Sequence, residues 1–251
     1  MAIQKSEAIL LRRQDLRETS MILTFYTKDF GKIKGIVRGV RGPRAQFGGG
    51  GFEIFALDSI VFYERKTNDI YTISQCDLLE FFDPVRGSLE ALAHAAYMVE
   101  LVDSVTGLSD PHAGVFELLL NSLKLLAGGS SAKRITRIFE IKLLDLLGLM
   151  PTLRQCATCG KDTEIGCRFS LRHGGLICKT CAATDRESVP MLPGTVKFIE
   201  LVRTLPFDKV SRVKVTREIG KELEGLLRKF LNYHIERRLK TVDFLREIEK
   251  A

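Results

Sequence analysis

The chain has 251 residues, 45% of them hydrophobic and 27% charged, a composition that is typical of a globular protein and excludes a fibrous or largely disordered one. Its net charge of +7 and its pI near 9.1 favour a nucleic acid or another acidic partner, although solubility alone also accounts for such a charge. No apolar run reaches membrane-spanning length and the first residues are not those of a secretory signal, so we expect a cytoplasmic protein without a membrane partner.

Residues 1 to about 80 carry the signals of short β-strands. Five segments are rich in Ile, Val, Phe and Tyr and are separated by turn residues such as Asp29 and Gly31. The five segments are residues 5–13, 20–27, 32–38, 52–64 and 69–76. This number of strands in so short a stretch predicts a small barrel or sandwich. The four consecutive glycines at 48–51 predict an exposed loop between the third and fourth strands.

From Asp83 onward the apolar residues recur at helical spacing. The predicted helices are residues 88–106, 112–127, 133–149 and 216–238. In the last of these, one face carries Ile219, Leu223, Leu226, Leu227, Phe230 and Leu231. We therefore expect a helical domain in two parts, residues 81–150 and 186–251, with a cysteine-rich module at 151–185 inserted between them.

Two Cys-x-x-Cys pairs delimit that module: Cys156 with Cys159, and Cys178 with Cys181. Two tight turns that each point two sulfurs inward can complete the tetrahedral shell of one Zn²⁺ ion, and Gly160 suits such a turn because it tolerates a positive φ. The alternatives are free thiols or a redox pair, but a redox pair of the thioredoxin type needs a neighbouring βαβ pattern that the sequence lacks. Four sulfur ligands leave no open position for substrate, so we expect one structural Zn²⁺.

The other two cysteines and His173 are not expected to bind the metal. Cys76 and Cys167 lie in strand-like runs and are expected to be small buried hydrophobic residues. His173 lies outside the Cys-x-x-Cys pattern and is expected to be a loop residue.

The sequence shows no recognisable enzyme motif. It lacks a phosphate-binding Gly-x-x-x-x-Gly-Lys-Ser/Thr loop, Gly-x-Gly-x-x-Gly after a strand, His-Glu-x-x-His and Gly-x-Ser-x-Gly. No nucleophile, base and orienting group come together along the chain. We therefore expect a protein that is not an enzyme, and no catalytic residues.

Positive charge is concentrated at residues 28–44, KDFGKIKGIVRGVRGPR, where six cations accompany one acid. Strand alternation places Lys32 and Lys34 on one face, and Arg38, Arg41 and Arg44 follow in the glycine-containing loop. Cations of this kind bind phosphates, and aromatic rings nearby can stack on bases. The predicted DNA-binding residues are Lys32, Lys34, Arg38, Arg41 and Arg44, whereas most of the phenylalanines are expected in the core.

A second basic cluster lies near the C-terminus, at Arg237, Arg238 and Lys240. Cations are favoured at the C-terminal end of a helix because they complement its dipole. The sequence therefore leaves open whether this cluster binds DNA.

The ordered set of segments EAILLRR, SMILTFYTKDFGKIKGIVRGVRGPRAQFGG, LLDLLGLMP followed by CATCG, FSLRHGGLICKTC and YHIERRLKTVDFL resembles the RecO family of bacterial recombination mediators over essentially the whole chain. The resemblance implies an α+β multidomain protein: an N-terminal five-stranded OB-fold barrel at 1–80, then an α-helical domain with an inserted zinc module. It also implies a non-enzymatic, nucleoid-associated function in DNA repair. Such proteins bind single- and double-stranded DNA and anneal complementary strands. With RecR, they help to load RecA onto DNA coated by single-strand-binding protein.

Two other hypotheses compete with this one. The first is an RNA-binding or ribosome-associated protein with a zinc ribbon and an OB-fold, since an OB-fold supports RNA binding equally well. The second is an enzyme whose active site has no recognisable motif.

Overall fold

The computed structural model describes residues 3–17, 19–40, 52–63, 70–162, 167–235 and 238–248. The chain divides into two compact units. Unit 1 comprises Met1–Ala132 and Leu239–Ala251, and unit 2 comprises Lys133–Arg238. By this division the first two long helices group with the strands, whereas the predicted ranges placed them in a helical domain. The predicted domain bounds, residues 1–80, 81–150, 151–185 and 186–251, remain a prediction.

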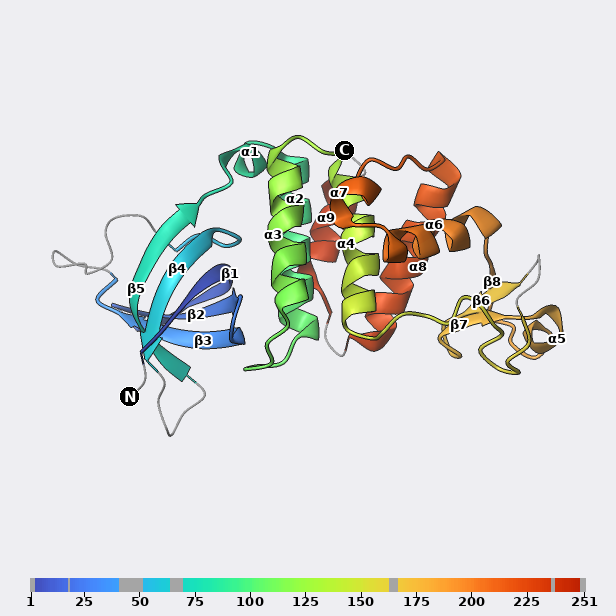
Figure 1. The fold of residues 1–251 in the computed structure, drawn as a ribbon, viewed down its shortest axis with the longest axis horizontal. Coiled ribbons are helices and arrows are strands. Elements are labelled where there is room, and N and C mark those ends of the chain that lie inside the picture. Colours follow the sequence, from blue (N-terminus) through green and yellow to red (C-terminus); the bar gives the residue numbers. More distant parts are fainter. Residues whose placement is uncertain are drawn as a thin grey trace. The chain divides into compact units, whose positions relative to one another are not determined.

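Unit 1 contains a closed five-stranded barrel, which confirms the predicted fold class (Figure 1). Its strands are β1 (Ile3–Arg17), β2 (Ser20–Thr27), β3 (Gly31–Arg38), β4 (Leu57–Tyr63) and β5 (Ile70–Glu80). The strand order is β1-β2-β3-β5-β4, with a parallel pairing only between β3 and β5. This is the strand order of an OB-fold.

Alternation along each strand directs one set of side chains into the barrel core. The core residues include Leu10, Leu23, Phe25, Ile33, Val37, Ile60, Phe62 and Ile73. Gly35 lies on the inner face of β3, where a Cβ atom would lie 2.4 Å from the Ile73 side chain. The absence of a side chain at Gly35 therefore lets β5 pack closely across the barrel.

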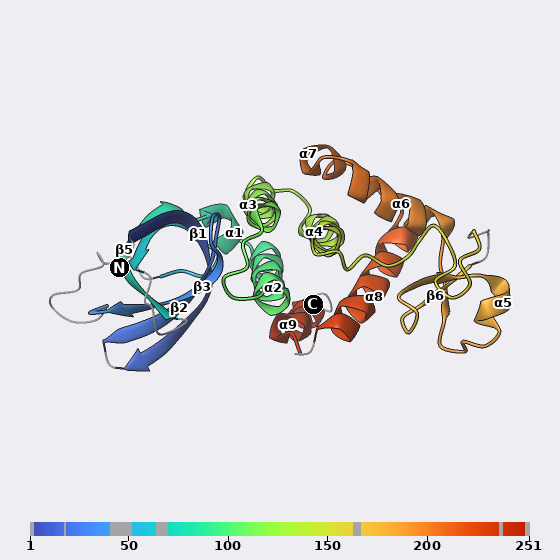
Figure 2. The ribbon, with the colours of Figure 1, turned by 60° about the horizontal axis from the view of Figure 1, so that its bottom comes forward.

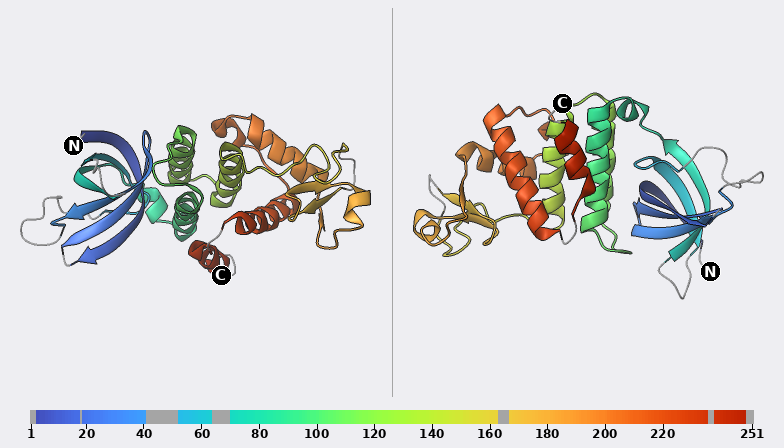
Figure 3. Two further views of the ribbon diagram at one scale, coloured as in Figure 1. Left: turned by 90° about the horizontal axis from the view of Figure 1, so that it is seen from below. Right: turned by 180° about the vertical axis from the view of Figure 1, so that it is seen from behind.

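The helices of unit 1 are α1 (Asp83–Arg86), α2 (Leu89–Val105), α3 (Ala113–Ala127) and α9 (Lys240–Ile248). Ser88 caps α2, because its side chain accepts a hydrogen bond from the amide of Ala91. The C-terminal helix α9 lies along α2 (Figure 3). Both carboxylate oxygens of Glu100 on α2 accept hydrogen bonds from the first turn of α9: from the amide of Lys240 at 3.0 Å, and from the amide and hydroxyl of Thr241 at 2.9 and 2.6 Å.

Unit 2 combines helices with a small three-stranded sheet. Its elements are α4 (Ala132–Leu146), β6 (Arg168–Ser170), β7 (Gly175–Ile177), α5 (Lys179–Ala182), β8 (Val189–Pro190), α6 (Pro193–Thr204), α7 (Phe207–Val210) and α8 (Arg217–His234). The helices α6 and α8 pack on each other (Figure 2). Lys142 on α4 donates hydrogen bonds to the carbonyls of Arg203 and Leu205, and so satisfies the C-terminal end of α6.

The predicted helix at 216–238 is shorter in the structure. Helix α8 ends at His234, since Ile235 has extended backbone angles, and a separate helix α9 begins at Lys240. The predicted apolar face of α8 is confirmed over Leu223–Leu231, whereas Ile219 is half-buried. Within the described residues, no helix has the length and hydropathy that crossing a membrane requires.

Candidate metal centre and nucleic-acid surface

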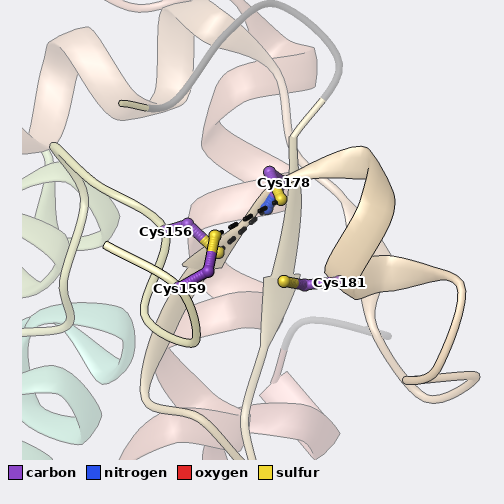
Figure 4. A group of neighbouring side chains, drawn as sticks. All are labelled: Cys156, Cys159, Cys178 and Cys181. Atoms are coloured by element: carbon purple, nitrogen blue, oxygen red, sulfur yellow. Dashed lines mark hydrogen bonds between the residues drawn. The ribbon is translucent and has the colours of Figure 1, made fainter. Parts of the chain in front are cut away.

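The four cysteines of the two Cys-x-x-Cys pairs come together in unit 2 (Figure 4). The sulfurs of Cys156, Cys159, Cys178 and Cys181 all lie within 4.8 Å of one another. The sulfurs of Cys159 and Cys178, which belong to different pairs, are 3.8 Å apart. The described chain therefore contains a group of four sulfur atoms that could hold one metal ion, as the spacing predicted.

The backbone around each pair accounts for this convergence. Cys156 and Gly160 form a tight turn in which the Gly160 amide donates to the Cys156 carbonyl at 2.9 Å, and Gly160 has a φ of +73°. A positive φ suits glycine, so the predicted role of Gly160 is confirmed. Cys178 immediately precedes α5 and Cys181 lies within it, and the Cys178 amide donates to the Cys156 sulfur at 3.3 Å.

Hydrogen bonding distributes protons unequally among these thiols. Burial raises the pKa of Cys156, but donation from the amides of Cys178, Cys159 and Thr158 outweighs that effect and lowers the pKa to about 6. The pKa of Cys178 is also lowered, chiefly by the amide of Cys181. The pKa of Cys181 is raised to about 12, first because its thiol is hydrogen-bonded to Cys178. Cys156 and Cys178, one from each pair, thus favour the thiolate, which is the form that binds a cation.

The cysteine-containing module is held to the rest of unit 2 by buried contacts. Phe169 on β6 packs edge-on against Phe230 of α8, with ring centroids 6.0 Å apart, and both rings are buried. Within the module, the Ser170 hydroxyl donates to Asp185 at 2.5 Å, and Arg168 donates to the side chain and carbonyl of Ser188, just beyond the module. The sheet whose strand β7 ends immediately before Cys178 is therefore anchored on α8.

The remaining cysteines and His173 are not members of the four-sulfur group. Cys76 lies on β5 and packs against the barrel core, and Cys167 immediately precedes β6. Both are half-buried rather than fully buried. His173 is exposed in the turn between β6 and β7 and is not part of the four-residue group.

The outer face of the barrel carries exposed cations. Residues 32, 34, 36 and 38 of β3 share the outer face, because Ile33, Gly35 and Val37 point into the core. Lys34 and Arg38 are exposed. In the register of β1, β2 and β3, Thr24 lies between Arg12 on one side and Lys34 on the other.

Arg12 was not among the predicted residues, although it is exposed and on the same face. A register shift between Leu10 and Arg12 brings Arg12 opposite Thr24, and simple alternation from the preceding strand residues does not predict that shift. Within the described parts of the chain, neither Arg12, Lys34 nor Arg38 forms an ion pair with an acid. This open outer face is formed by Arg12, Lys34 and Arg38, and we call it the barrel basic face.

Lys32 differs from the prediction of a phosphate-facing side chain. Its side chain is buried, and its Nζ donates to the carbonyl of Asp103 at 2.7 Å and lies 3.5 Å from a carboxylate oxygen of the same residue. The segment after α2 covers this end of β3, since the amide of Ser109 donates to the Lys32 carbonyl. Lys32 therefore shares a face with Lys34 as expected, but it is neutralised within unit 1.

The barrel basic face, as defined, includes neither the predicted loop beyond Arg38 nor the nearby aromatic residues. Arg41, Arg44 and the four-glycine loop lie outside the described residues. Phe25 and Tyr26 are fully buried, and Phe30 packs edge-on against Phe62. Between the cations of the barrel basic face lie instead the half-buried side chains of Ile22 and Ile36.

The C-terminal cluster also has a different setting from the expected one. Arg237 lies outside the described residues, and Arg238 and Lys240 are exposed. Lys240 begins α9, so it lies at the N-terminal end of a helix rather than at a C-terminal end. The dipole argument that the sequence suggested for Lys240 is therefore wrong.

Two family models together cover nearly all of the chain. "Recombination protein O N terminal" matches residues 1–82, and "Recombination protein O C terminal" matches residues 86–243. Among similar proteins, the DNA repair protein RecO of Pelotomaculum thermopropionicum is 34% identical over 251 residues, which is 100% of this chain and 96% of that protein. The DNA repair protein RecO of Desulforamulus reducens is 33% identical and covers 100% of this chain and 97% of its own length.

Proposed function

This chain belongs to the RecO family, and from that membership we propose that it is a non-enzymatic DNA-binding mediator of recombination in DNA repair. In this proposal it binds single- and double-stranded DNA through the barrel and anneals complementary strands. With RecR, it helps to load RecA onto DNA that single-strand-binding protein coats. It would act in the cytoplasm, at the nucleoid.

The observation that carries the DNA-binding part is the barrel basic face. Lys34 and Arg38 are exposed on the outer face of β3, and Arg12 lies one strand beyond β2 on the same face. The outer face of the second and third strands is the ligand-binding face of OB-folds. Cations that are not neutralised within the protein can replace the counterions of a phosphate backbone, and this interaction is independent of base sequence. Binding that leaves the base edges free is compatible with strand annealing.

We further propose that the four cysteines hold one structural Zn²⁺ ion. A tetrahedron with Zn–S bonds of about 2.3 Å has sulfur–sulfur edges of about 3.8 Å. The separation of the Cys159 and Cys178 sulfurs supports this geometry. Four thiolates leave no position for substrate, so the ion would stabilise the turns that carry them.

The test of the DNA-binding surface is a charge reversal at Lys34→Glu with Arg38→Glu. The matched control is Lys5→Glu with Lys124→Glu, since these lysines are exposed in the same unit and the change in charge is equal. Fluorescence anisotropy with a labelled single-stranded oligonucleotide should show affinity at about 50 mM salt weakened at least about tenfold in the first variant and little changed in the control.

The salt dependence of the wild type supplies a second readout. Its log–log slope should be about −0.7 for each phosphate neutralised, and the Lys34 and Arg38 reversal should make it shallower. Equal affinities for the two variants would place the DNA-binding surface elsewhere. Preferential binding of an RNA oligonucleotide of the same sequence would favour the RNA-binding hypothesis.

A further inference from the structure

The excess positive charge of this protein lies in unit 2 and not in the unit that contains the barrel. Unit 2 has 21 lysines and arginines against 12 aspartates and glutamates, a net charge of +9. Unit 1 has 17 against 19, a net charge of −2. Zn²⁺ bound by four thiolates would add two negative charges to unit 2, which would still be strongly positive. The barrel basic face is therefore a local feature, and unit 2 contributes the larger long-range attraction for a polyanion.

Part of this charge is concentrated at the connection from α7 to α8. Lys209, Arg212, Lys214 and Arg217 are all exposed, and no acid occurs between the first and the last of them. None of these four side chains forms an ion pair with an acid whose side chain the structure describes, and the side chain of Asp208 lies outside that set. Val213 and Val215 alternate with the cations and are half-buried. The valines thus anchor the connection and leave the cations in solvent.

The fold adds a cation from a distant part of the sequence. Arg134 in the first turn of α4 contacts the carbonyl of Ser211, at the end of α7, at 3.5 Å. Figure 1 shows that α7 and the first turns of α4 and α8 lie at the same end of unit 2. We call the surface formed by Arg134, Lys209, Arg212, Lys214 and Arg217 the unit 2 basic surface.

Helix stability does not account for cations at these positions. Arg217 is the first residue of α8 and Arg134 the third of α4, and the N-terminal end of a helix repels positive charge. Only Glu218 in the first turn of α8 has the favoured sign. An anion bound here would be attracted both by the side chains and by the free amides of the helix ends.

The surroundings of this surface favour a phosphate backbone over an acidic protein. A surface that binds another protein usually has a centre of apolar and aromatic side chains, which are exposed before the partner binds. Among the described residues, no exposed large hydrophobic side chain falls within residues 206–217. Contacts from cations and backbone amides alone are those that proteins make to the phosphates of nucleic acids.

We propose that the unit 2 basic surface is a second nucleic-acid site, which binds the phosphate backbone of a single strand independently of the barrel basic face. The proposal rests on the proposed function and extends it, because annealing brings two strands to one protein. A second cationic site separate from the first would hold the second strand without competing for the same side chains.

The test is a triple reversal, Arg212→Glu, Lys214→Glu and Arg217→Glu, in the full chain. Glutamate suits the start of α8, so the helix should form normally. The matched control is Arg172→Glu, Lys197→Glu and Lys229→Glu, three exposed cations of unit 2 at other places in its fold. Thermal melting followed by circular dichroism verifies that both variants fold, and Arg212→Gln, Lys214→Gln and Arg217→Gln replace the reversal if its melting temperature falls.

Anisotropy titrations of a labelled oligothymidine at several salt concentrations supply the readout. We expect the triple reversal to bind at least about tenfold more weakly at about 50 mM salt and to have a log–log slope shallower by about 2, since three cations each contribute about 0.7. It should also remove the residual binding of the Lys34→Glu, Arg38→Glu variant. If the triple reversal binds DNA as the control does, the proposal is overturned, whatever the barrel variant shows. The proposal is also overturned if the triple reversal keeps its DNA binding but loses binding to a poly-glutamate peptide. Failure of the barrel variant alone to weaken binding would count against the proposed barrel site and leave this one standing.

Discussion

At the residue scale, Lys32 and Lys34 show how neighbouring lysines on one strand face can have different functions. Both point outward from β3, two residues apart. Lys34 is in solvent, whereas the side chains of Lys32 and Asp103 are only 10% and 13% exposed. A buried charge that loses its partner is costly, so Lys32 contributes to the packing of α2 on the barrel.

We predict that Lys32→Met destabilises the protein without a specific loss of DNA binding. The substitution keeps the aliphatic chain but leaves the Asp103 carboxylate without its cation. The free energy of unfolding in urea should fall by about 2 kcal/mol. Lys34→Met, the matched change at the exposed position, should alter it by less than about 0.5 kcal/mol. A smaller effect at Lys32 than at Lys34 would contradict the structural role.

A second residue with an unusual environment is Asp58 on β4. Its side chain is buried, and one of its carboxylate oxygens has no hydrogen-bond partner. Burial raises the pKa of Asp58 to about 6, and a hydrogen bond with Cys76 lowers it only in part. Burial also raises the pKa of the Cys76 thiol, which therefore stays protonated and can donate.

Asp58 should make stability fall as the pH rises. Because its folded pKa exceeds the ordinary value of 3.8, the folded state binds its proton more tightly than the unfolded state does. The penalty is absent below about pH 4, grows up to about pH 6 and is constant above it. The shift corresponds to at most about 3 kcal/mol.

The measurement is urea unfolding of the wild type and of Asp58→Asn from pH 4 to pH 8. The variant keeps the shape of the protonated acid and cannot ionise. Its stability relative to the wild type should improve steadily between pH 4 and pH 6 and then level off. A difference that does not change with pH would mean that Asp58 ionises normally in the folded protein.

At the element scale, the two Cys-x-x-Cys turns are short segments whose geometry depends on one another. The sulfur of Cys156 accepts a hydrogen bond from the amide of Cys178, on the opposite turn. Among the described residues at 151–190, the strands are short and few side chains are buried. A metal ion that bridges both turns would supply the stability that so small a core lacks.

We predict one Zn²⁺ per chain in native mass spectrometry. Cys156→Ser with Cys178→Ser should abolish zinc binding and lower the thermal melting temperature of unit 2, because β6 packs on α8 through Phe169 and Phe230. Cys167→Ser is the control. Because Cys167 lies outside the group of four, this variant should retain the ion. Full zinc content in the double variant would exclude these sulfurs as the ligands.

Also at this scale, the C-terminal helix α9 completes unit 1. Its first turn is capped by Glu100 of α2, and its buried residues Val242 and Leu245 lie on one side of the helix. Glu100 thus places a negative charge at the N-terminal end of α9, where the helix dipole favours it. Helix α9 thus packs with an element from the first half of the chain.

At the scale of the whole molecule, positive charge occurs on two separate surfaces, the barrel basic face in unit 1 and the unit 2 basic surface. Except for the half-buried Arg134, the cations of both surfaces are exposed, and none forms an ion pair with an acid whose side chain the structure describes. Annealing requires two strands to be close together while their mutual repulsion is screened. Two surfaces on one chain would meet both requirements.

We predict that annealing of complementary oligonucleotides depends on both surfaces. In a fluorescence-quenching assay, the Lys34, Arg38 reversal and the Arg212, Lys214, Arg217 reversal should each slow annealing at least about tenfold, and their combination should leave only the spontaneous rate. The charge-matched controls should anneal at the wild-type rate. Full activity in both variants would mean that neither surface takes part in annealing.

The sequence by itself determined the features that depend on local pattern. The five strands follow from β-propensity and turn residues, and the buried stripe of α8 from helical periodicity. The metal centre was predictable because each Cys-x-x-Cys turn is a local structure whose chemistry tolerates few alternatives. The positive φ of Gly160 was predictable for the same reason.

Only the tertiary structure decided which charged side chains meet solvent and which lie together. Lys32 is neutralised by Asp103, which is 71 residues away in the chain, and Arg12 joins Lys34 through a register shift in β1. Arg134 reaches the α7–α8 connection from 77 residues away. Alternation and periodicity assign a residue to a face of its own element, but the exposure of that face depends on which distant segment covers it, and this is set by the packing of the whole unit.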